Sequence, residues 1–250
     1  MSSEKTDAMI IRLADWSESS KVVTFFSRDF GKISAVAKGA KRLKGPFEAA
    51  IDLLAVCRIV FIRKSSSGLD ILTEAQLQQR FKPNGRNLLG LYGGYYVAEL
   101  LSSFTEEYDP NPELYDIAVR TLSSLSDEPD HKITLLKFEL ALLRETGHLP
   151  LFDACMACGK PAEAGDARFG FWVSQGGLIC RECQKREHQS QPEIQTGTLA
   201  ILRRLSEENG GSMKNLQISD KQYAEMRRVV TASIRYVMGR DSKMSRYLRL

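Results

Sequence analysis

The stretch Cys155-Met156-Ala157-Cys158-Gly159 and its counterpart Cys180-Arg181-Glu182-Cys183 decide how the middle of this chain folds. Each carries a Cys-x-x-Cys pair, whose two sulfurs can reach one ion from a tight turn, and 21 residues separate the pairs. Four thiolates fill a tetrahedral shell, so the pattern predicts one structural Zn²⁺ bound by Cys155, Cys158, Cys180 and Cys183. The alternatives are two disulfides, four unrelated buried thiols, or a reduced and empty site.

The composition is that of an ordinary globular protein, with 43% hydrophobic and 26% charged residues. A length of 250 residues allows two or three small domains. The sequence shows neither a signal peptide nor an apolar run of about 18 residues, so we expect no membrane partner. Four of the five cysteines stand in metal-binding spacing, which suits the reducing cytoplasm, and Cys57 is expected in the core.

Charge is distributed unevenly along the chain. The total is +4, but residues 1–80 carry a net +4, residues 81–153 carry −6, residues 154–218 carry +1 and residues 219–250 carry +5. Basic ends therefore flank an acidic middle. This asymmetry favours a nucleic-acid partner more strongly than the total charge does.

Short β-like runs separated by turn signals fill the first 80 residues. They cover residues 10–13, 21–26, 33–37, 49–63 and 70–81. Five strands of this length predict a small closed barrel, of either the OB or the SH3-like type.

A cationic loop joins the third and fourth expected strands. Four cations stand within seven residues, and no acidic residue occurs between Phe30 and Phe47; the cations are Lys38, Lys41, Arg42 and Lys44, with Lys32 close by. Such a loop can neutralise phosphates and release their counterions, although a plain solvated loop is the alternative. Candidate aromatics for base stacking are Phe25, Phe26 and Phe30, and strand alternation places Phe25 and Phe26 on opposite faces.

After Pro83 the apolar period becomes helical. Helices are expected over residues 84–104, 111–125, 130–147, 196–209 and 219–238, with a β-hairpin over 167–173 and 176–179 between the cysteine pairs. The fold class is therefore α+β: a five-stranded barrel, then a mostly α-helical domain with an embedded four-cysteine zinc module. The expected segments are 1–82 (barrel), 83–153 (helical, first part), 154–190 (zinc module) and 191–250 (helical, C-terminal part).

Three stretches resemble the bacterial recombination mediator family RecO. They are Phe138 to Pro150 running on into Cys155–Gly159, Gly31 to Arg42, and the opening Ile11-Arg12-Leu13 with Ser17 to Lys21. The order and length of the segments agree with that family over nearly the whole chain, most weakly in the C-terminal third.

The resemblance implies an N-terminal OB fold and a non-enzymatic role in DNA recombination and repair. Members of this family bind single- and double-stranded DNA, anneal complementary strands and work with RecR. They help RecA to displace single-strand-binding protein, and they dock the acidic C-terminal tail of that protein. It also implies a cytoplasmic, nucleoid-associated location. The implied DNA contacts are Lys32, Lys38, Lys41, Arg42 and Lys44, with Arg28 as a further candidate; the tail-docking candidates on the last helix are Arg227, Arg228 and Arg235.

Two other functions fit parts of the pattern. A structural RNA-binding module with a zinc knuckle would use the same barrel and the same basic loop. A zinc hydrolase would need an open coordination site with a nearby base, whereas four cysteines close the shell and the three histidines are scattered.

Overall fold

A computed structural model of the chain describes residues 3–42, 47, 50–64, 68–83, 88–127, 131–162, 168–187, 192–207 and 217–248. The chain forms two compact units. The first comprises Met1–Leu135 with Ser242–Arg249, and the second comprises Leu136–Asp241 with Leu250. None of the described helices combines the length and the apolar character that crossing a membrane requires. The four-segment division expected from the sequence stays a prediction.

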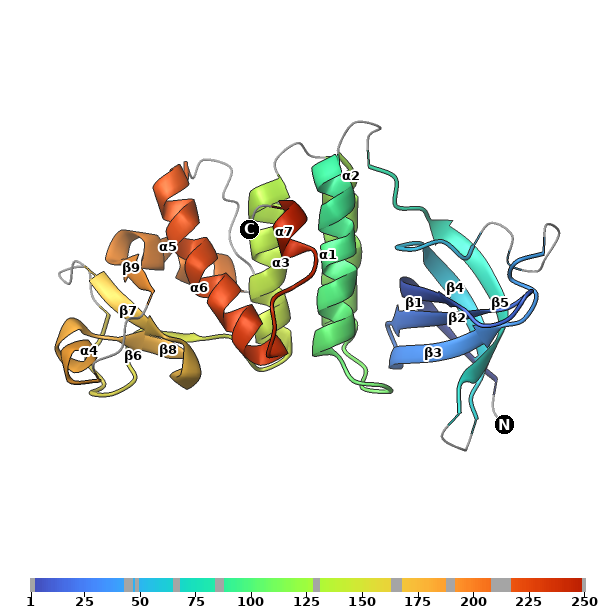
Figure 1. Cartoon of the computed structure of the whole chain (residues 1–250), viewed down its shortest axis with the longest axis horizontal. Coiled ribbons are helices and arrows are strands. Elements are labelled where there is room, and N and C mark those ends of the chain that lie inside the picture. Colours follow the sequence, from blue (N-terminus) through green and yellow to red (C-terminus); the bar gives the residue numbers. More distant parts are fainter. Residues whose placement is uncertain are drawn as a thin grey trace. The chain divides into compact units, whose positions relative to one another are not determined.

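The first unit begins with a closed five-stranded barrel, as the sequence predicted (Figure 1, blue to cyan). Its strands, in the order β1-β2-β3-β5-β4 around the barrel, are β1 (Ser3–Asp15), β2 (Lys21–Ser27), β3 (Gly31–Ala37), β4 (Val56–Ile62) and β5 (Asp70–Gln79). The fourth strand starts at Val56 and not at residue 49, because residues 52–54 form a turn. That turn ends at Leu54, which has a positive φ of 67° and donates its backbone N–H to the carbonyl of Ile10.

Alternation along the strands fills the barrel. In β3 every second residue is buried, so Ile33, Ala35 and Ala37 point inward against Phe25 and Phe61. Strand β1 is long enough to pair with β2 on one side and β4 on the other. A register shift between Ile10 and Arg12 bends it, which is how a short sheet closes on itself.

Helices α1 (Leu88–Phe104) and α2 (Pro112–Asp127) complete the first unit, together with the short α7 (Ser245–Leu248). The side chain of Asn111 accepts a hydrogen bond of 2.9 Å from the backbone N–H of Leu114, so Asn111 caps α2 at the start of the helix expected over residues 111–125. Phe26 of β2 packs against Tyr115 of α2 with ring centroids 6.2 Å apart. The barrel is therefore packed on its own helices by apolar contacts.

The α1–α2 connection is also tied to the edge of β3. Tyr108 donates its backbone N–H to the carbonyl of Lys32 at 3.0 Å. The backbones of Lys32 and Glu107 form an isolated parallel β-bridge. At Gly31, an added Cβ would lie 2.0 Å from the carbonyl oxygen of Asp109. Gly31 also has a φ of +66°, so this position combines a left-handed backbone with a very close approach of two chain segments.

The second unit contains a small sheet of order β6-β8-β7-β9 and the helices around it. Its elements are β6 (Leu151–Cys155), β7 (Arg168–Trp172), the 3₁₀ turn η1 (Val173–Gln175), β8 (Gly177–Ile179), α4 (Arg181–Glu187), β9 (Glu193–Gln195), α5 (Thr196–Ser206) and α6 (Asp220–Met238). Strands β7 and β8 are antiparallel, which confirms the hairpin expected between the cysteine pairs. Helix α3 (His131–Glu145) contains the boundary between the two units.

The ends of α6 follow the sequence signals. Ser219 and Gln222 form a capping box at its start, and Gly239 ends it with a φ of +66°. Helix α5 ends earlier than expected, because the backbone of Glu207 has an extended conformation.

Candidate functional site

Two neighbouring strands of the second unit bring the cysteine pairs together. Cys155 is the last residue of β6, and Cys180 follows the last residue of β8, its parallel neighbour. Backbone hydrogen bonds lock this end of the sheet, because Met156 donates its N–H to the carbonyl of Leu178 at 2.8 Å. The chain then turns at Gly159, with φ +73°, while Cys183 stands in the first turn of α4.

The four predicted sulfur donors therefore form one cluster. The Sγ atoms of Cys155, Cys158, Cys180 and Cys183 all lie within 4.8 Å of one another. The Sγ atoms of Cys158 and Cys180 are 3.8 Å apart. Cys155 and Cys180 are buried, whereas Cys158 is exposed, so one side of the cluster reaches the surface. The donor set and its spacing are consistent with a metal site.

The backbone around Cys155 favours the ionised form of its sulfur. Burial opposes ionisation of Cys155, but backbone N–H groups of Cys180, Cys158 and Ala157 donate toward its sulfur, and the net result is a pKa of about 7. The N–H of Cys180 is 3.3 Å from this sulfur. Four thiolates this close repel one another strongly, and a bound cation relieves that repulsion.

The basic loop after β3 lies beside the β1–β2 turn. Lys41 donates its backbone N–H to the carbonyl of Ser19 at 3.1 Å, and its ammonium group lies 3.1 Å from Asp15. Lys38 and Arg42 are exposed, and neither side-chain end takes part in an ion pair with another described residue. Lys44 lies outside the described residues.

Arg28 and Lys32 have internal partners in the first unit. Arg28 donates from Nε and Nη2 to the two carboxylate oxygens of Asp116 in α2, at 3.0 and 2.9 Å. Lys32 donates to the backbone carbonyls of Ser102 and Thr105, and so caps the C-terminal end of α1 with a cation. Both cations are therefore engaged inside the fold before any ligand binds.

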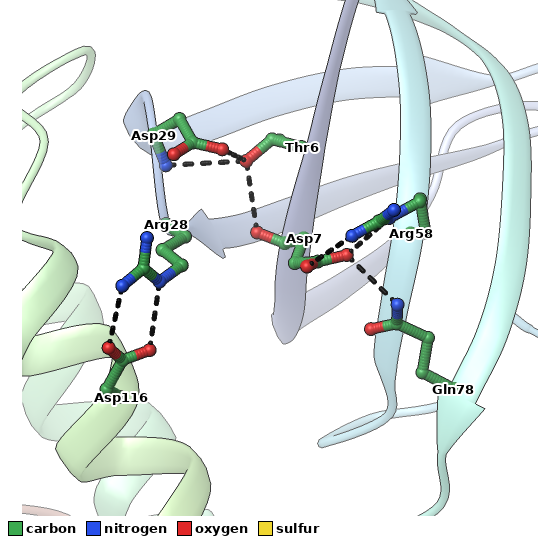
Figure 2. A network of polar contacts seen from close by, with 7 residues as sticks. All are labelled: Thr6, Asp7, Arg28, Asp29, Arg58, Gln78 and Asp116. Carbon is green, nitrogen blue, oxygen red and sulfur yellow. Dashed lines mark hydrogen bonds and ion pairs between the residues drawn. The ribbon is translucent and has the colours of Figure 1, made fainter.

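A second arginine on the barrel is paired in the same way. Figure 2 shows Arg58 of β4 reaching across to Asp7 of β1, with Gln78 of β5 donating to the same carboxylate. Both arginine–oxygen distances are 2.8 Å. The hydrogen bonds from Arg58 lower the pKa of Asp7, and those from Arg28 lower the pKa of Asp116.

The phenylalanines considered for stacking do not face solvent. Phe25 lies in the barrel core, Phe26 is buried against Tyr115, and Phe30 packs edge-on against Phe61 at 5.5 Å. Phe25 and Phe26 do lie on opposite faces of β2, as alternation predicted, but neither ring is exposed, because α2 covers the outer face of β2. The exposed aromatic of the barrel is Trp16, which is 62% exposed in the β1–β2 turn. Its signal in the sequence was a tryptophan inside a polar turn.

The three arginines of α6 have different environments. Arg227 is buried and forms an ion pair with Glu139 of α3, which is fully buried. The helical period of the sequence predicts Arg227 off the apolar face of α6, and that prediction is wrong. Arg235 is exposed and pairs with Asp241 at 3.2 Å. Arg228 is exposed and lines a polar cavity of about 290 Å³. The cavity is lined by Arg168, Pro192, Glu193, Gln195, Glu225 and Arg228.

Comparison with known proteins accounts for nearly the whole chain. Residues 1–81 match the family model "Recombination protein O N terminal", and residues 85–246 match "Recombination protein O C terminal". A protein of Rhodopirellula baltica named "DNA repair protein RecO" is 41% identical over 204 residues, which cover 80% of this chain and 74% of the relative. Proteins of the same name from Anaeromyxobacter dehalogenans and Syntrophus aciditrophicus are 30% and 29% identical, over 98% of this chain in each case and 95% and 94% of the relatives.

Proposed function

This chain belongs to the RecO family of DNA repair proteins, and we propose that it is a non-enzymatic recombination mediator. In this role it binds single- and double-stranded DNA and anneals complementary strands. With RecR it helps to load RecA on DNA coated by single-strand-binding protein. Its DNA substrate would place it on the nucleoid in the cytoplasm. The observation that carries the proposal is a small barrel with an exposed cationic loop, in a chain that matches the family over residues 1–81 and 85–246.

The proposed DNA contacts begin with Lys38 and Arg42, because both are exposed and neither pairs with a described residue. Lys41 and Lys44 belong to the same loop, and Lys41 also fixes the position of the loop through Asp15. Arg28 and Lys32 support the interface by holding the barrel on its helices. Arg28 and Lys32 can bind a phosphate only if they release their present partners in the first unit.

Annealing by this mechanism needs no catalytic side chain. Cations that bind two phosphate backbones reduce the repulsion between strands and raise their effective concentration. Docking on a partner that already coats single strands brings the protein to its substrate. Neither step makes or breaks a covalent bond.

We propose that the cysteine cluster binds one structural Zn²⁺. Tetrahedral Zn–S bonds of about 2.3 Å require sulfur–sulfur distances of about 3.8 Å. The Cys158–Cys180 separation is 3.8 Å. Four thiolates leave no open position, so the ion would stabilise the β6–β9 sheet and take no part in chemistry.

For docking of the acidic tail of single-strand-binding protein, we propose Arg228 over Arg227 and Arg235. Arg227 is buried in an ion pair and Arg235 faces Asp241, whereas Arg228 is exposed at the rim of a cavity whose other arginine, Arg168, is paired with Glu193. A guanidinium at the rim of a cavity can bind a carboxylate with two hydrogen bonds.

The decisive experiment is annealing of complementary oligonucleotides coated with single-strand-binding protein, either intact or lacking its acidic tail. Annealing that requires the tail supports a mediator that docks on its partner. Equal annealing with both forms leaves a general DNA binder without docking. Absence of annealing, with preferred binding of RNA over DNA of the same sequence, supports the RNA-binding alternative.

The loop assignment is tested by Lys38→Glu with Arg42→Glu. A matched control is Arg204→Glu with Lys221→Glu, two exposed cations of the second unit that change the net charge equally. We expect weaker DNA binding and a smaller slope of log affinity against log salt, by roughly 0.7 per lost phosphate contact, only in the loop variant. An unchanged slope there excludes the loop as the interface.

A further inference from the structure

The function proposed above gives no role to Trp16, an exposed aromatic side chain of the barrel. Trp16 is 62% exposed, although tryptophan is the largest apolar side chain and is usually well buried. We infer that Trp16 is a stacking platform for an unpaired base of single-stranded DNA, and that it forms one site with the cations of the basic loop. This inference rests on the proposed DNA binding and adds a preference for single strands.

The turn that carries Trp16 has a fixed backbone. The last pair of the β1–β2 ladder is Asp15 with Lys21, directly before and after the turn. Within it, the N–H groups of Trp16 and Ser17 both donate to the carbonyl of Ser20, at 3.1 and 3.3 Å. A ring on an ordered backbone loses less entropy on binding than a ring on a mobile loop.

Among the described residues, Lys41 joins the basic loop to this turn by three contacts. Its N–H donates to the carbonyl of Ser19 at 3.1 Å, its ammonium donates to the carbonyl of Ser17 at 2.9 Å, and the ammonium pairs with Asp15 at 3.1 Å. Lys41 therefore acts mainly as a positioning residue. It keeps Lys38 and Arg42, which are three residues and one residue away along the chain, beside the tryptophan turn.

Charges around Trp16 have both signs. Asp15 is largely exposed but faces Lys41, and Glu18 is exposed in the turn itself. Lys38, Arg42 and Arg12 are exposed cations of the same unit. The loop cations supply the attraction for phosphate, whereas Glu18 opposes it. Removal of the Glu18 charge is therefore expected to strengthen binding.

The chemistry of this pair of elements favours single strands. Phosphates of single- and double-stranded DNA are both attracted by cations, so Lys38 and Arg42 do not distinguish the two. An aromatic ring can stack on a base only where the base is unpaired and turned out of a duplex. The β1–β2 turn is also one of the two loops with which OB-type barrels bind oligonucleotides.

The test measures affinity for an oligo-dT strand and for a DNA hairpin duplex at one salt concentration. The variants are Trp16→Ala, Trp16→Phe and, as control, Tyr236→Ala, which removes an aromatic of α6 with a similar exposure of 58%. We expect Trp16→Ala to weaken single-strand binding about tenfold, which is typical of one lost base stack, and to leave the duplex affinity unchanged. Trp16→Phe should restore most of the affinity, and Tyr236→Ala should change neither.

The remaining outcomes separate this inference from the proposed function. If Trp16→Ala binds both DNAs normally while Lys38→Glu with Arg42→Glu loses both, the stacking role is wrong and DNA binding stands. If Trp16→Ala weakens both DNAs equally, the residue acts through the loop and stacking is again wrong. If the wild-type protein binds neither DNA, the proposed function fails first.

Fluorescence provides a direct readout of the ring. The chain has two tryptophans, Trp16 and Trp172, so a Trp172→Phe variant reports on Trp16 alone. Saturable quenching by oligo-dT, without quenching by the duplex, supports a base stacked on the indole. Binding of oligo-dT without a fluorescence change overturns the inference.

Discussion

Arg28 joins the barrel to Asp116 of α2 through two parallel hydrogen bonds of 3.0 and 2.9 Å. The pair links residues 88 positions apart, from the β2–β3 turn and helix α2 of one compact unit (Figure 2). Its geometry is the bidentate one in which a guanidinium matches a carboxylate, so it fixes orientation as well as distance.

We expect Asp116→Asn to lower stability without raising DNA affinity. The side chain of Arg28 is 45% exposed, and an ion pair so open to solvent adds little to stability. Thermal denaturation and oligonucleotide titration measure the two quantities. A several-fold gain in affinity in Asp116→Asn would instead mean that Asp116 competes with phosphate for Arg28, which would then be a DNA contact.

Stability of the first unit is expected to fall at low pH. Paired arginines hold the pKa values of Asp7 and Asp116 below the ordinary 3.8, so the folded state keeps both ionised more readily than the unfolded chain. This contribution is fully present above pH 3.8 and is lost as the pH falls through the lowered pKa values. Denaturant titrations between pH 6 and pH 2 measure how the free energy of unfolding falls with pH. This fall should be smaller in the double variant Asp7→Asn with Asp116→Asn than in the wild type.

Gly31→Ala is expected to destabilise the protein by about 3 kcal/mol or more. The new Cβ would meet the Asp109 backbone at 2.0 Å and would also need a left-handed backbone. Gly39→Ala is the matched control, because Gly39 has a φ of +77° and meets only the Arg42 side chain, at 3.6 Å. It should cost about 1 kcal/mol. Equal losses of unfolding free energy in the two variants, measured by urea denaturation, would contradict the close approach of Gly31 to the Asp109 backbone.

Arg227→Met is expected to cost about 3–5 kcal/mol, because it leaves the fully buried Glu139 without its charge partner. Combining it with Glu139→Leu should recover most of the loss. On the same helix, Arg235→Met removes an exposed pair with Asp241 and should cost less than about 1 kcal/mol. A loss in Arg227→Met that persists in the double variant would show that packing, and not charge, is responsible.

Removal of the proposed Zn²⁺ is expected to unfold the β6–β9 sheet and to leave the barrel folded, because the four cysteines belong to the second unit. Chelator titration followed by circular dichroism and zinc release measures this effect. Cys180→Ser should bind less metal and show the same partial unfolding. Complete retention of the second unit after full metal loss would mean that the sheet is stable without the ion.

Local sequence signals predicted much of this protein. Turn residues separated the barrel strands, Asn111 and Ser219 marked helix starts, and the two Cys-x-x-Cys pairs identified a cluster that the fold brings within 4.8 Å. These signals act over a few residues, or through a ligand spacing that the chemistry fixes. They require no knowledge of which elements meet in space.

Long-range electrostatics could not be predicted in this way. The sequence groups Lys32 with the cations of the basic loop. Its ammonium group instead donates to two backbone carbonyls at the end of α1, 70 and 73 residues away in the chain. Arg227 of α6 is buried together with its ion-pair partner Glu139 of α3. The helical periodicity of the sequence does not distinguish a buried charged residue such as Glu139 from one that faces solvent. Trp16 was missed because an exposed tryptophan is recognised only when the turn and the loop are seen together.

The return of the chain to its first unit constrains how the protein forms during translation. Glu99 of α1 accepts hydrogen bonds from the hydroxyl of Ser242 and from the backbone N–H groups of Lys243 and Met244, residues at least 143 positions later. Tyr92 contacts Tyr247, with ring centroids 5.4 Å apart. The barrel can therefore emerge from the ribosome early, but α1 keeps an unfinished surface until the whole second unit has been synthesised. A nascent chain stalled within that unit would expose this surface to chaperones.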